Sequence, residues 1–359
     1  MFRSLKLFLA ATLLLAPGCG ESEPAGPLIA GAEPLNLQQP ERAREAAQQS
    51  DPSIMAIVAV LPVLQLALIL EDQEAGCPLL VDESDRSSGT VSWRIEGDCE
   101  GENEAGRYRV DGIIVARGDS DRTDIDYRGF RYSAGDASGC DGWDSTLLTS
   151  GAVRLPYAYM LPAGDDADDA PDEDEVPGAG RYLLDVYLER SATDIESCAV
   201  EKTEIAYDVT IDRRFERTDP AGDLADVSDM KGRVAMLVHS RESAQGAWQT
   251  TWNGDWRVSA DDYGSMDGGE DCDRHATGTL RLESGDDVAV IQPSAPVSCF
   301  ETRADACTAW SLNGEAQPEM CDFLGQSGCS AGPDAPPPWA AIILLVGGLI
   351  WQSRRRQRI

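Results

Sequence analysis

The sequence is poor in the residue types that most metal and nucleophile sites use. Its 359 residues include only two histidines, His239 and His275, and no two cysteines have the C-x-x-C spacing of zinc and redox sites. The G-x-S-x-G motif of serine hydrolases is also absent. We therefore expect neither a zinc enzyme nor a serine hydrolase, and we predict that both histidines are exposed strand or loop residues.

Positive charge is also scarce. The chain has 30 Lys and Arg against 63 Asp and Glu, which gives a formal net charge of −33. A nucleic-acid backbone would be repelled by such a surface, so we expect no nucleic-acid partner. Hydrophobic residues still make up 42% of the chain. That share is enough for a packed core, so global disorder is not expected.

Residues 1–19 have the pattern of an export signal. Arg3 and Lys6 precede an apolar run that is too short for a stable membrane span, and Cys19 follows. The segment resembles the lipobox of bacterial lipoproteins, although Ala16 replaces the usual Leu. The resemblance implies lipidation of Cys19 and, because Gly20 follows, sorting to the outer membrane. An ordinary secretory peptide cut nearby is the alternative.

Residues 329–359 form a second predicted targeting segment. Cys329 is followed by a proline-rich spacer, an apolar stretch over 339–351, and a basic cluster that includes Arg354, Arg355 and Arg356. The apolar stretch would cover only ~20 Å of a ~30 Å hydrocarbon core. This order resembles the MYXO-CTERM sorting tail of myxobacterial surface proteins, which implies processing at Cys329. A tail anchor with the arginines in the cytoplasm is the alternative.

Eight further cysteines remain, an even number that indicates a disulfide framework in an exported chain. Many pairings are possible, and sequential pairing is the simplest. It would join Cys77 to Cys99, Cys140 to Cys198, Cys272 to Cys299, and Cys307 to Cys321. A metal–thiolate site is a weaker reading because neither histidine is spaced as a partner ligand.

Residues 20–50 predict a tether that ends in a short helix over 40–50. Asp51-Pro52 then begins a second helix, 51–72, which is apolar from Ser53 to Leu70 apart from Gln65. Pro62, Gln65 and the acidic flanks favour a helix buried against a sheet. A membrane span is the alternative.

Residues 77–325 predict antiparallel β-structure. Apolar and polar residues alternate at 91–96 and 204–212, which indicates strands with one apolar and one solvated face. Further β-rich runs lie near 107–116, 123–133, 181–190, 232–240, 246–259, 277–283 and 287–293. The predicted fold is mainly β: an antiparallel sandwich, half-barrel or curved sheet with an N-terminal helical segment, stapled by disulfides. Asn253-Gly254 predicts a type I′ hairpin turn.

The acidic, low-complexity segment 163–180 interrupts this β region. It could separate two domains or form a solvated insertion in one sheet. We favour the insertion, since each half alone holds few strong strands.

Two weak candidate sites can be named. Asp119, Asp121, Asp124 and Asp126 could supply oxygen ligands to calcium, although they do not match an EF-hand. A solvated acidic surface is the simpler reading, so we expect no cofactor. Trp248 and Trp252 would share a strand face and could stack on a sugar ring, but core packing is the commoner role of tryptophan.

These patterns specify a location more clearly than an activity. We predict an exported, membrane-anchored cell-envelope protein at the outer membrane or cell surface, with a structural or ligand-binding, non-enzymatic β domain. Its expected partners are the membrane, the export and sorting machinery, and a glycan or apolar ligand. The alternative is a secreted, glycosidase-like hydrolase that uses a carboxylate pair.

Overall fold

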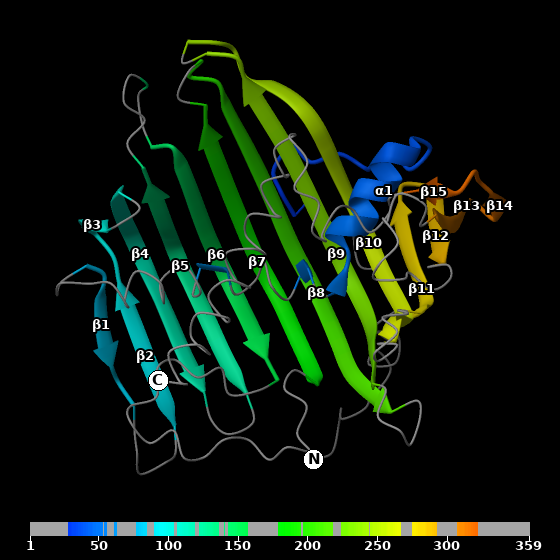
Figure 1. The fold of residues 1–359 in the computed structure, drawn as a ribbon, viewed down its shortest axis with the longest axis horizontal. Coiled ribbons are helices and arrows are strands. Elements are labelled where there is room, and N and C mark those ends of the chain that lie inside the picture. Colours follow the sequence, from blue (N-terminus) through cyan, green and yellow to red (C-terminus); the bar gives the residue numbers. More distant parts are fainter. Residues whose placement is uncertain are drawn as a thin grey trace, which may run out of the picture.

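The computed structural model describes residues 28–52, 54–55, 61–62, 77–84, 90–103, 106–118, 122–135, 140, 143–156, 179–194, 197–217, 224–243, 245–266, 275–292 and 307–321. In this part the chain forms a short helix and one antiparallel sheet of 15 strands (Figure 1). The mainly β fold class predicted from the sequence is therefore confirmed. Among the predicted architectures, the observed one is a single open sheet rather than a sandwich.

Strands that follow one another in the chain lie side by side in the sheet, with two exceptions. Strand β3 pairs with β4, so β2 and β4 are neighbours, and β15 pairs with β13. The helix is α1 (Pro40–Gln49). The strands are β1 (Leu79–Asp82), β2 (Val91–Glu96), β3 (Cys99–Asn103), β4 (Gly106–Gly118), β5 (Thr123–Ala134), β6 (Ser145–Leu155), β7 (Gly180–Thr193), β8 (Val200–Arg217), β9 (Leu224–Arg241), β10 (Gln249–Met266), β11 (His275–Ser284), β12 (Asp287–Gln292), β13 (Cys307–Leu312), β14 (Glu315–Ala316) and β15 (Met320–Cys321).

The predicted alternation gives the sheet one apolar and one polar face. On β8, Ile205, Tyr207, Val209 and Ile211 are buried on the apolar face, whereas Asp208 is exposed on the polar face. The main core lies on the apolar face, where α1 covers the region of β9 to β11 (Figure 1). The buried alanines of α1 allow it to approach the sheet closely; they are Ala43, Ala46 and Ala47.

The predicted apolar helix 51–72 falls largely outside the described residues. Of its described residues, Met55 and Leu61 are helical and buried in the main core beside the sheet. In the described part of the chain no helix has the length and apolar character that crossing a membrane requires.

Two of the four predicted disulfides are present. Cys77 bonds to Cys99 and Cys140 bonds to Cys198, with Cα–Cα distances of 5.7 and 5.5 Å. Closing loops of 22 and 58 residues stabilises the fold by roughly 3–4 kcal/mol per bridge in the chain-entropy model. Cys307 and Cys321 lie opposite each other in the backbone register of β13 and β15. The described residues do not include Cys19, Cys272, Cys299 or Cys329.

The acidic segment 163–180 connects two neighbours in one sheet. β6 and β7, on either side of it, pair directly from Ser145↔Ala192 to Arg154↔Leu183. This pairing favours the insertion over the domain boundary. Residues 163–178 themselves lie outside the described residues.

The predicted hairpin at Asn253-Gly254 is wrong, because β10 runs through both residues without a turn. Asn253 instead binds residues near the N-terminus. Its side-chain oxygen accepts the Glu33 N–H at 2.9 Å, and its amide donates to the Gly31 carbonyl at 3.2 Å. A Cβ on Gly254 would lie 2.6 Å from the Trp252 ring, so glycine is required here for close packing rather than for a turn.

Residues 28–37, which we call the N-terminal strap, cross the edge of β10 from the polar face to the apolar face. On the polar face, Ile29 is buried against Ala206, Ala235 and Leu237. At the edge, the Leu35 N–H donates to the Asp255 carbonyl at 3.2 Å. Beyond it, Leu35 and Leu37 enter the main core. The edge is available because β11 pairs with β10 only from Arg257 onward.

Candidate functional site

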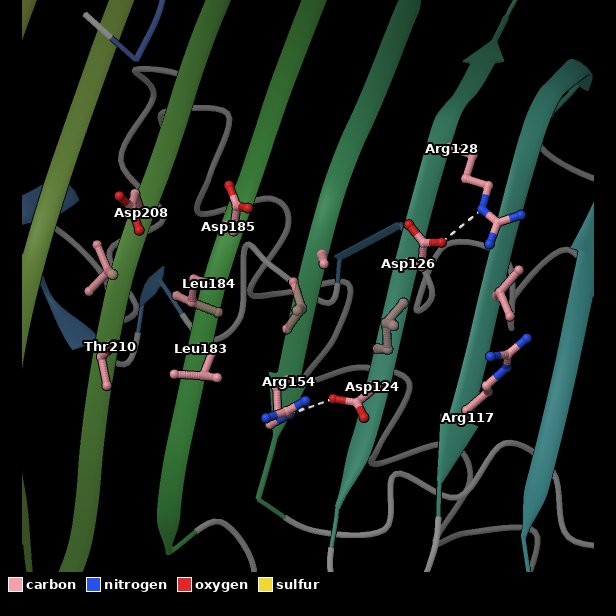
Figure 2. Close-up of a pocket in the computed structure, with 15 residues that line it drawn as sticks. Arg117, Asp124, Asp126, Arg128, Arg154, Leu183, Leu184, Asp185, Asp208 and Thr210 are labelled. Atoms are coloured by element: carbon pink, nitrogen blue, oxygen red, sulfur yellow. Dashed lines mark hydrogen bonds and ion pairs between the residues drawn. The ribbon is translucent and has the colours of Figure 1, made fainter. Parts of the chain in front are cut away.

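A pocket on the polar face is the candidate site, and the strand register explains its lining. One row of residues crosses the sheet as Val115, Asp126, Ala152, Asp185 and Asp208, on β4 to β8. The row beside it reads Arg117, Asp124, Arg154, Leu183 and Thr210. The two rows line a cavity of about 550 Å³ (Figure 2). This volume is within the range of small-molecule sites.

Small and apolar residues produce the hollow. Ala152 lies between Asp126 and Asp185 in one row, and Leu183 lies between Arg154 and Thr210 in the other. Ala152 separates two longer, charged side chains, and Leu183 contributes an apolar one, so the floor of the pocket is low and uncharged at these two positions. The site is therefore a trough with charged walls.

Two ion pairs occupy one side of the trough. Arg154 Nε donates to Asp124 Oδ1 at 2.6 Å, and Arg128 Nε donates to Asp126 Oδ2 at 2.7 Å (Figure 2). Arg122 lies 3.6 Å from the other oxygen of Asp124. All of these groups are at least 40% exposed, so the pairs add little to stability. They position the side chains rather than hold the sheet together.

Three charged side chains of the pocket lining have no ion-pair partner among the described residues. Arg117, Asp185 and Asp208 are exposed, and they make no ion pair or hydrogen bond with the part of the chain that the structure describes. Asp185 and Asp208 are direct cross-strand partners on β7 and β8. Like charges in that arrangement destabilise a sheet, so the pair requires an explanation other than folding.

A second polar cluster lies farther along the same face of β7 to β9. Lys202 Nζ contacts Glu189 at 2.9 Å and Glu204 at 2.8 Å, and the Tyr187 hydroxyl donates to Glu204 at 2.8 Å. His239 Nε2 lies 3.8 Å from Glu204. The carboxylates of this cluster are thus bridged by donors from within the chain.

The electrostatics of this cluster follow from those bridges. Burial alone would raise the pKa of Glu204, but the hydrogen bonds from Lys202 and Tyr187 hold that pKa below its usual value. Burial and the nearby carboxylates raise the pKa of Tyr187. Burial favours the neutral form of Lys202, but the bonds to Glu204 and Glu189 outweigh it and raise the lysine pKa. The cluster is a closed ion network rather than an open site.

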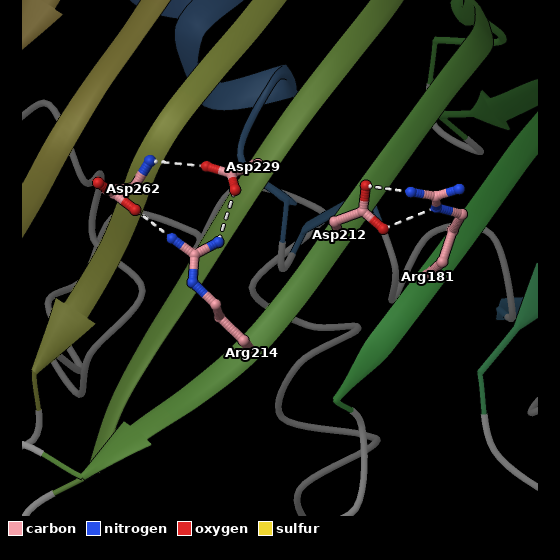
Figure 3. Close-up of polar contacts among 5 residues, drawn as sticks. All are labelled: Arg181, Asp212, Arg214, Asp229 and Asp262. Atoms are coloured by element: carbon pink, nitrogen blue, oxygen red, sulfur yellow. Dashed lines mark hydrogen bonds and ion pairs between the residues drawn. The ribbon is translucent and has the colours of Figure 1, made fainter.

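Three carboxylates gather where β9 and β10 pair. Ligand oxygens of Asp229, Asp261 and Asp262 lie within 4.8 Å of one another. A guanidinium already lies there, because Arg214 binds both Asp229 and Asp262 (Figure 3). The Asp262 N–H donates to Asp229 Oδ1 at 2.9 Å, and this bond, together with Arg214, lowers the pKa of Asp229. The group therefore reads as an ion pair and not as a metal centre.

The predicted calcium site gains no support in the described residues. Asp124 and Asp126 lie on one face of β5, but each is bound to an arginine. Asp119 and Asp121 are outside the described residues. The calcium site stays a prediction.

The predicted tryptophan platform is not formed. Trp248 precedes β10 and is 48% exposed, with the Arg241 guanidinium 5.1 Å from its ring centre. Trp252 is only 6% exposed, with its ring 5.7 Å from that of Trp256 in the core. A buried ring is not available to a sugar. Of the two, only Trp248 remains a candidate for stacking.

The two histidines are not brought together in the described structure. His239 lies on β9, a strand residue as predicted, but it is only 24% exposed and its Nδ1 lies 3.1 Å from the Thr250 hydroxyl. His275 begins β11, and its side chain is outside the described part.

Sequence reasoning missed the pocket. The alternation at 181–190 and 204–212 places Asp185 and Asp208 on the polar face. What it does not give is the register that sets them opposite each other and brings Arg117 to the same trough. That register depends on pairing across connections of different lengths.

Comparison with known proteins assigns the chain to no family. No protein-family model matches the chain, and no curated protein or solved structure is significantly similar to it.

Proposed function

We propose that this chain is an exported, membrane-anchored cell-envelope protein, held at the outer membrane or cell surface by lipidated Cys19 and processed or anchored through the tail after Cys329. The lipobox-like and MYXO-CTERM-like segments support this proposal. The disulfides Cys77–Cys99 and Cys140–Cys198 are compatible with an oxidising compartment outside the cytoplasm.

The β domain acts as a binding module, and the trough on its polar face is the binding site. One observation carries this assignment. Among the residues that the structure describes, Arg117, Asp185 and Asp208 form no ion pair around a 550 Å³ pocket whose other charged side chains are paired. Unpaired charges that line a hollow are groups that a ligand can satisfy.

The hydrolase alternative finds less support. A glycosidase uses one carboxylate whose pKa is raised by burial and a second one at a suitable distance. Asp185 and Asp208 face each other but are both exposed. Glu189 and Glu204 are half-buried, but Lys202 and Tyr187 bridge them. Neither pair has the environment of a general acid and its partner.

Cell fractionation tests the location. The native protein should enter the outer-membrane fraction, and a protease added to intact cells should cleave it. The variant Cys19→Ser should leave that fraction while keeping the disulfide Cys77–Cys99. The matched variant Cys329→Ser should stay membrane-bound and retain residues beyond 329. A cytoplasmic protein with reduced cysteines would refute the proposal.

A further inference from the structure

One arginine lies on the apolar face of the sheet without a counter-ion. On β7, Val186 and Leu188 are buried in the main core, and Arg190 is the next residue on the same face. Arg190 is half-buried, and its side chain forms no ion pair or hydrogen bond with the described part of the chain. Burial lowers the pKa of Arg190, and the charge of Glu201 opposes that shift. A desolvated cation without a paired charge is costly, so this position requires an explanation other than folding.

The residues beside Arg190 do not neutralise it. Its row of the sheet, on β5 to β9, reads Tyr132, Leu147, Arg190, Thr203 and Val238. Glu201 is a diagonal neighbour on β8, but it is exposed and does not form an ion pair with Arg190. Leu147 is buried in the core, whereas the rest of the row is only partly buried. This end of the apolar face is therefore partly accessible from the solvent.

A buried hydroxyl next to Arg190 also lacks a partner. Thr149 on β6 pairs with Leu188, which makes it a diagonal neighbour of Arg190 on the same face, about 7–8 Å away. Its side chain is 0% exposed, and its Oγ1 has no hydrogen-bond partner among the described residues. Buried hydroxyls in folded proteins are nearly always hydrogen-bonded. A guanidinium and a hydroxyl, two donors on adjacent strands, thus both lack an acceptor at the same place.

The chemistry of these two groups specifies the acceptor. A guanidinium binds a carboxylate through two parallel hydrogen bonds, and the carboxylate has further lone pairs for a hydroxyl. Because Thr149 is fully buried, a head group that contacts both residues has to be small, which favours a carboxylate over a phosphate ester. The net charge of −33 disfavours a free anion, so apolar contacts have to add to its affinity. Leu147 and Val238, in the same row as Arg190, supply such contacts.

We propose that this end of the apolar face binds an alkyl carboxylate, the chemistry of a fatty acid, whose head group is held by Arg190 and Thr149 and whose chain packs on the apolar row beside them. The site lies on the opposite face of the sheet from the trough. It is therefore a second binding site, and it does not depend on which ligand the trough takes.

Titration calorimetry of the oxidised full chain tests the proposal with matched probes, in a fixed concentration of non-ionic detergent and with the heat of mixing into detergent alone subtracted. Octanoate should bind. Octanol lacks the charge and acetate lacks the chain, so each should bind at least about tenfold more weakly. Octyl phosphate has the same chain but a larger head group, and it should also bind more weakly than octanoate.

Two variants separate binding from folding. Arg190→Met and Thr149→Val remove the donors and nearly keep the side-chain size. Arg190→Met should weaken octanoate at least about tenfold and remove its preference over octanol, and Thr149→Val should weaken it about threefold. Neither should lower the urea midpoint of the ligand-free protein, because each removes a polar group that has no partner there. Arg131→Met, at an exposed arginine on the polar face of β5, is the matched control and should change neither binding nor stability.

Equal binding of octanoate and octanol would overturn the proposal, as would octanoate binding that survives Arg190→Met. Tighter binding of acetate or octyl phosphate than of octanoate would refute an alkyl carboxylate as the ligand. A lower urea midpoint in Arg190→Met would show that the guanidinium is satisfied within the chain, which would also overturn it. Failure of octanoate to bind the folded, oxidised protein would do the same. All of these outcomes leave the trough and the envelope location standing, because fractionation tests the location separately.

Discussion

Asp255 and Arg233 form a two-bond ion pair across β9 and β10, with N–O distances of 2.6 and 2.8 Å. The Asp255 side chain is only 7% exposed, and the Arg233 side chain is 24% exposed. The same carboxylate accepts the Leu28 N–H at 3.3 Å, and the backbone carbonyl of Asp255 accepts the Leu35 N–H. One residue therefore joins the ion pair, the edge of β10 and the N-terminal strap.

Replacing this carboxylate should destabilise the fold. Asp255→Asn removes the negative charge that faces the half-buried Arg233 and replaces one of the two acceptor oxygens with an N–H donor. Because breaking a largely buried ion pair is costly, we expect a loss of about 3 kcal/mol in the free energy of unfolding, measured by urea denaturation.

The matched control is Asp212→Asn. Arg181 and Asp212 form the same two-bond pair across β7 and β8, but their side chains are 66% and 45% exposed (Figure 3). An exposed pair contributes at most about 1 kcal/mol. Equal losses in the two variants would show that burial of Asp255 is not what makes its pair important.

The strap should depend on its apolar contact on the polar face. Ile29→Ala removes the side chain that covers Ala206, Ala235 and Leu237, and should cost about 2 kcal/mol. Hydrogen exchange at the Glu33 and Leu35 N–H groups should accelerate more than exchange in β4 to β6. Leu79→Ala, at a side chain that is 52% exposed, serves as the control and should leave exchange unchanged. Uniform acceleration across the sheet would contradict a local role.

The ion network around Glu204 should make stability depend on acid pH. The pKa of the Glu204 carboxyl is held below its usual value of 4.5 in the folded protein. The contribution of Glu204 to the free energy of unfolding is therefore fully present above pH 4.5 and is lost as the pH falls through the lower, folded-state pKa. Glu204→Gln should cost about 1–3 kcal/mol at neutral pH, with a difference from wild type that shrinks in strong acid.

The comparison for that experiment is Glu283→Gln. Glu283 pairs with Arg281 at 2.6 Å but is 39% exposed, so its removal should cost under about 1 kcal/mol. If Glu204→Gln lowers the free energy of unfolding by the same amount at neutral and acid pH, Glu204 stabilises the fold through packing and not through its charge.

A third disulfide should join Cys307 and Cys321. They are direct partners on antiparallel β13 and β15, where Cα atoms lie about 4.5–5.5 Å apart, within the span of a disulfide. Peptide mapping without reduction should recover this pair together with Cys77–Cys99 and Cys140–Cys198. A Cys307 linked to Cys299 or Cys272 would contradict the register.

The sequence predicted those features of the fold that depend on local pattern. Alternating residues such as Ile205 and Tyr207 identified the strands and their buried face, and the composition of 40–50 identified α1. Prediction from the sequence failed where a side chain binds residues that are far away in the chain. Asn253 has the signature of a turn, but it binds Gly31 and Glu33, more than 200 positions away in the chain.

The candidate site could not be predicted from the sequence for the same reason. Arg117, Asp185 and Asp208 meet only through the register of five strands, and no local spacing encodes that register. Trp252 shows the converse case, because its spacing from Trp248 suggests a shared exposed face while Trp256 and α1 bury it.

The location of this protein is the central claim, and the mass of its mature form tests that claim most directly. Non-reducing mass spectrometry of the native protein should find an acylated Cys19 as the first residue, no residues beyond Cys329, and the bridges Cys77–Cys99 and Cys140–Cys198. An unlipidated chain that still carries residues 1–19 and the arginines Arg354, Arg355 and Arg356, with reduced cysteines, would contradict it.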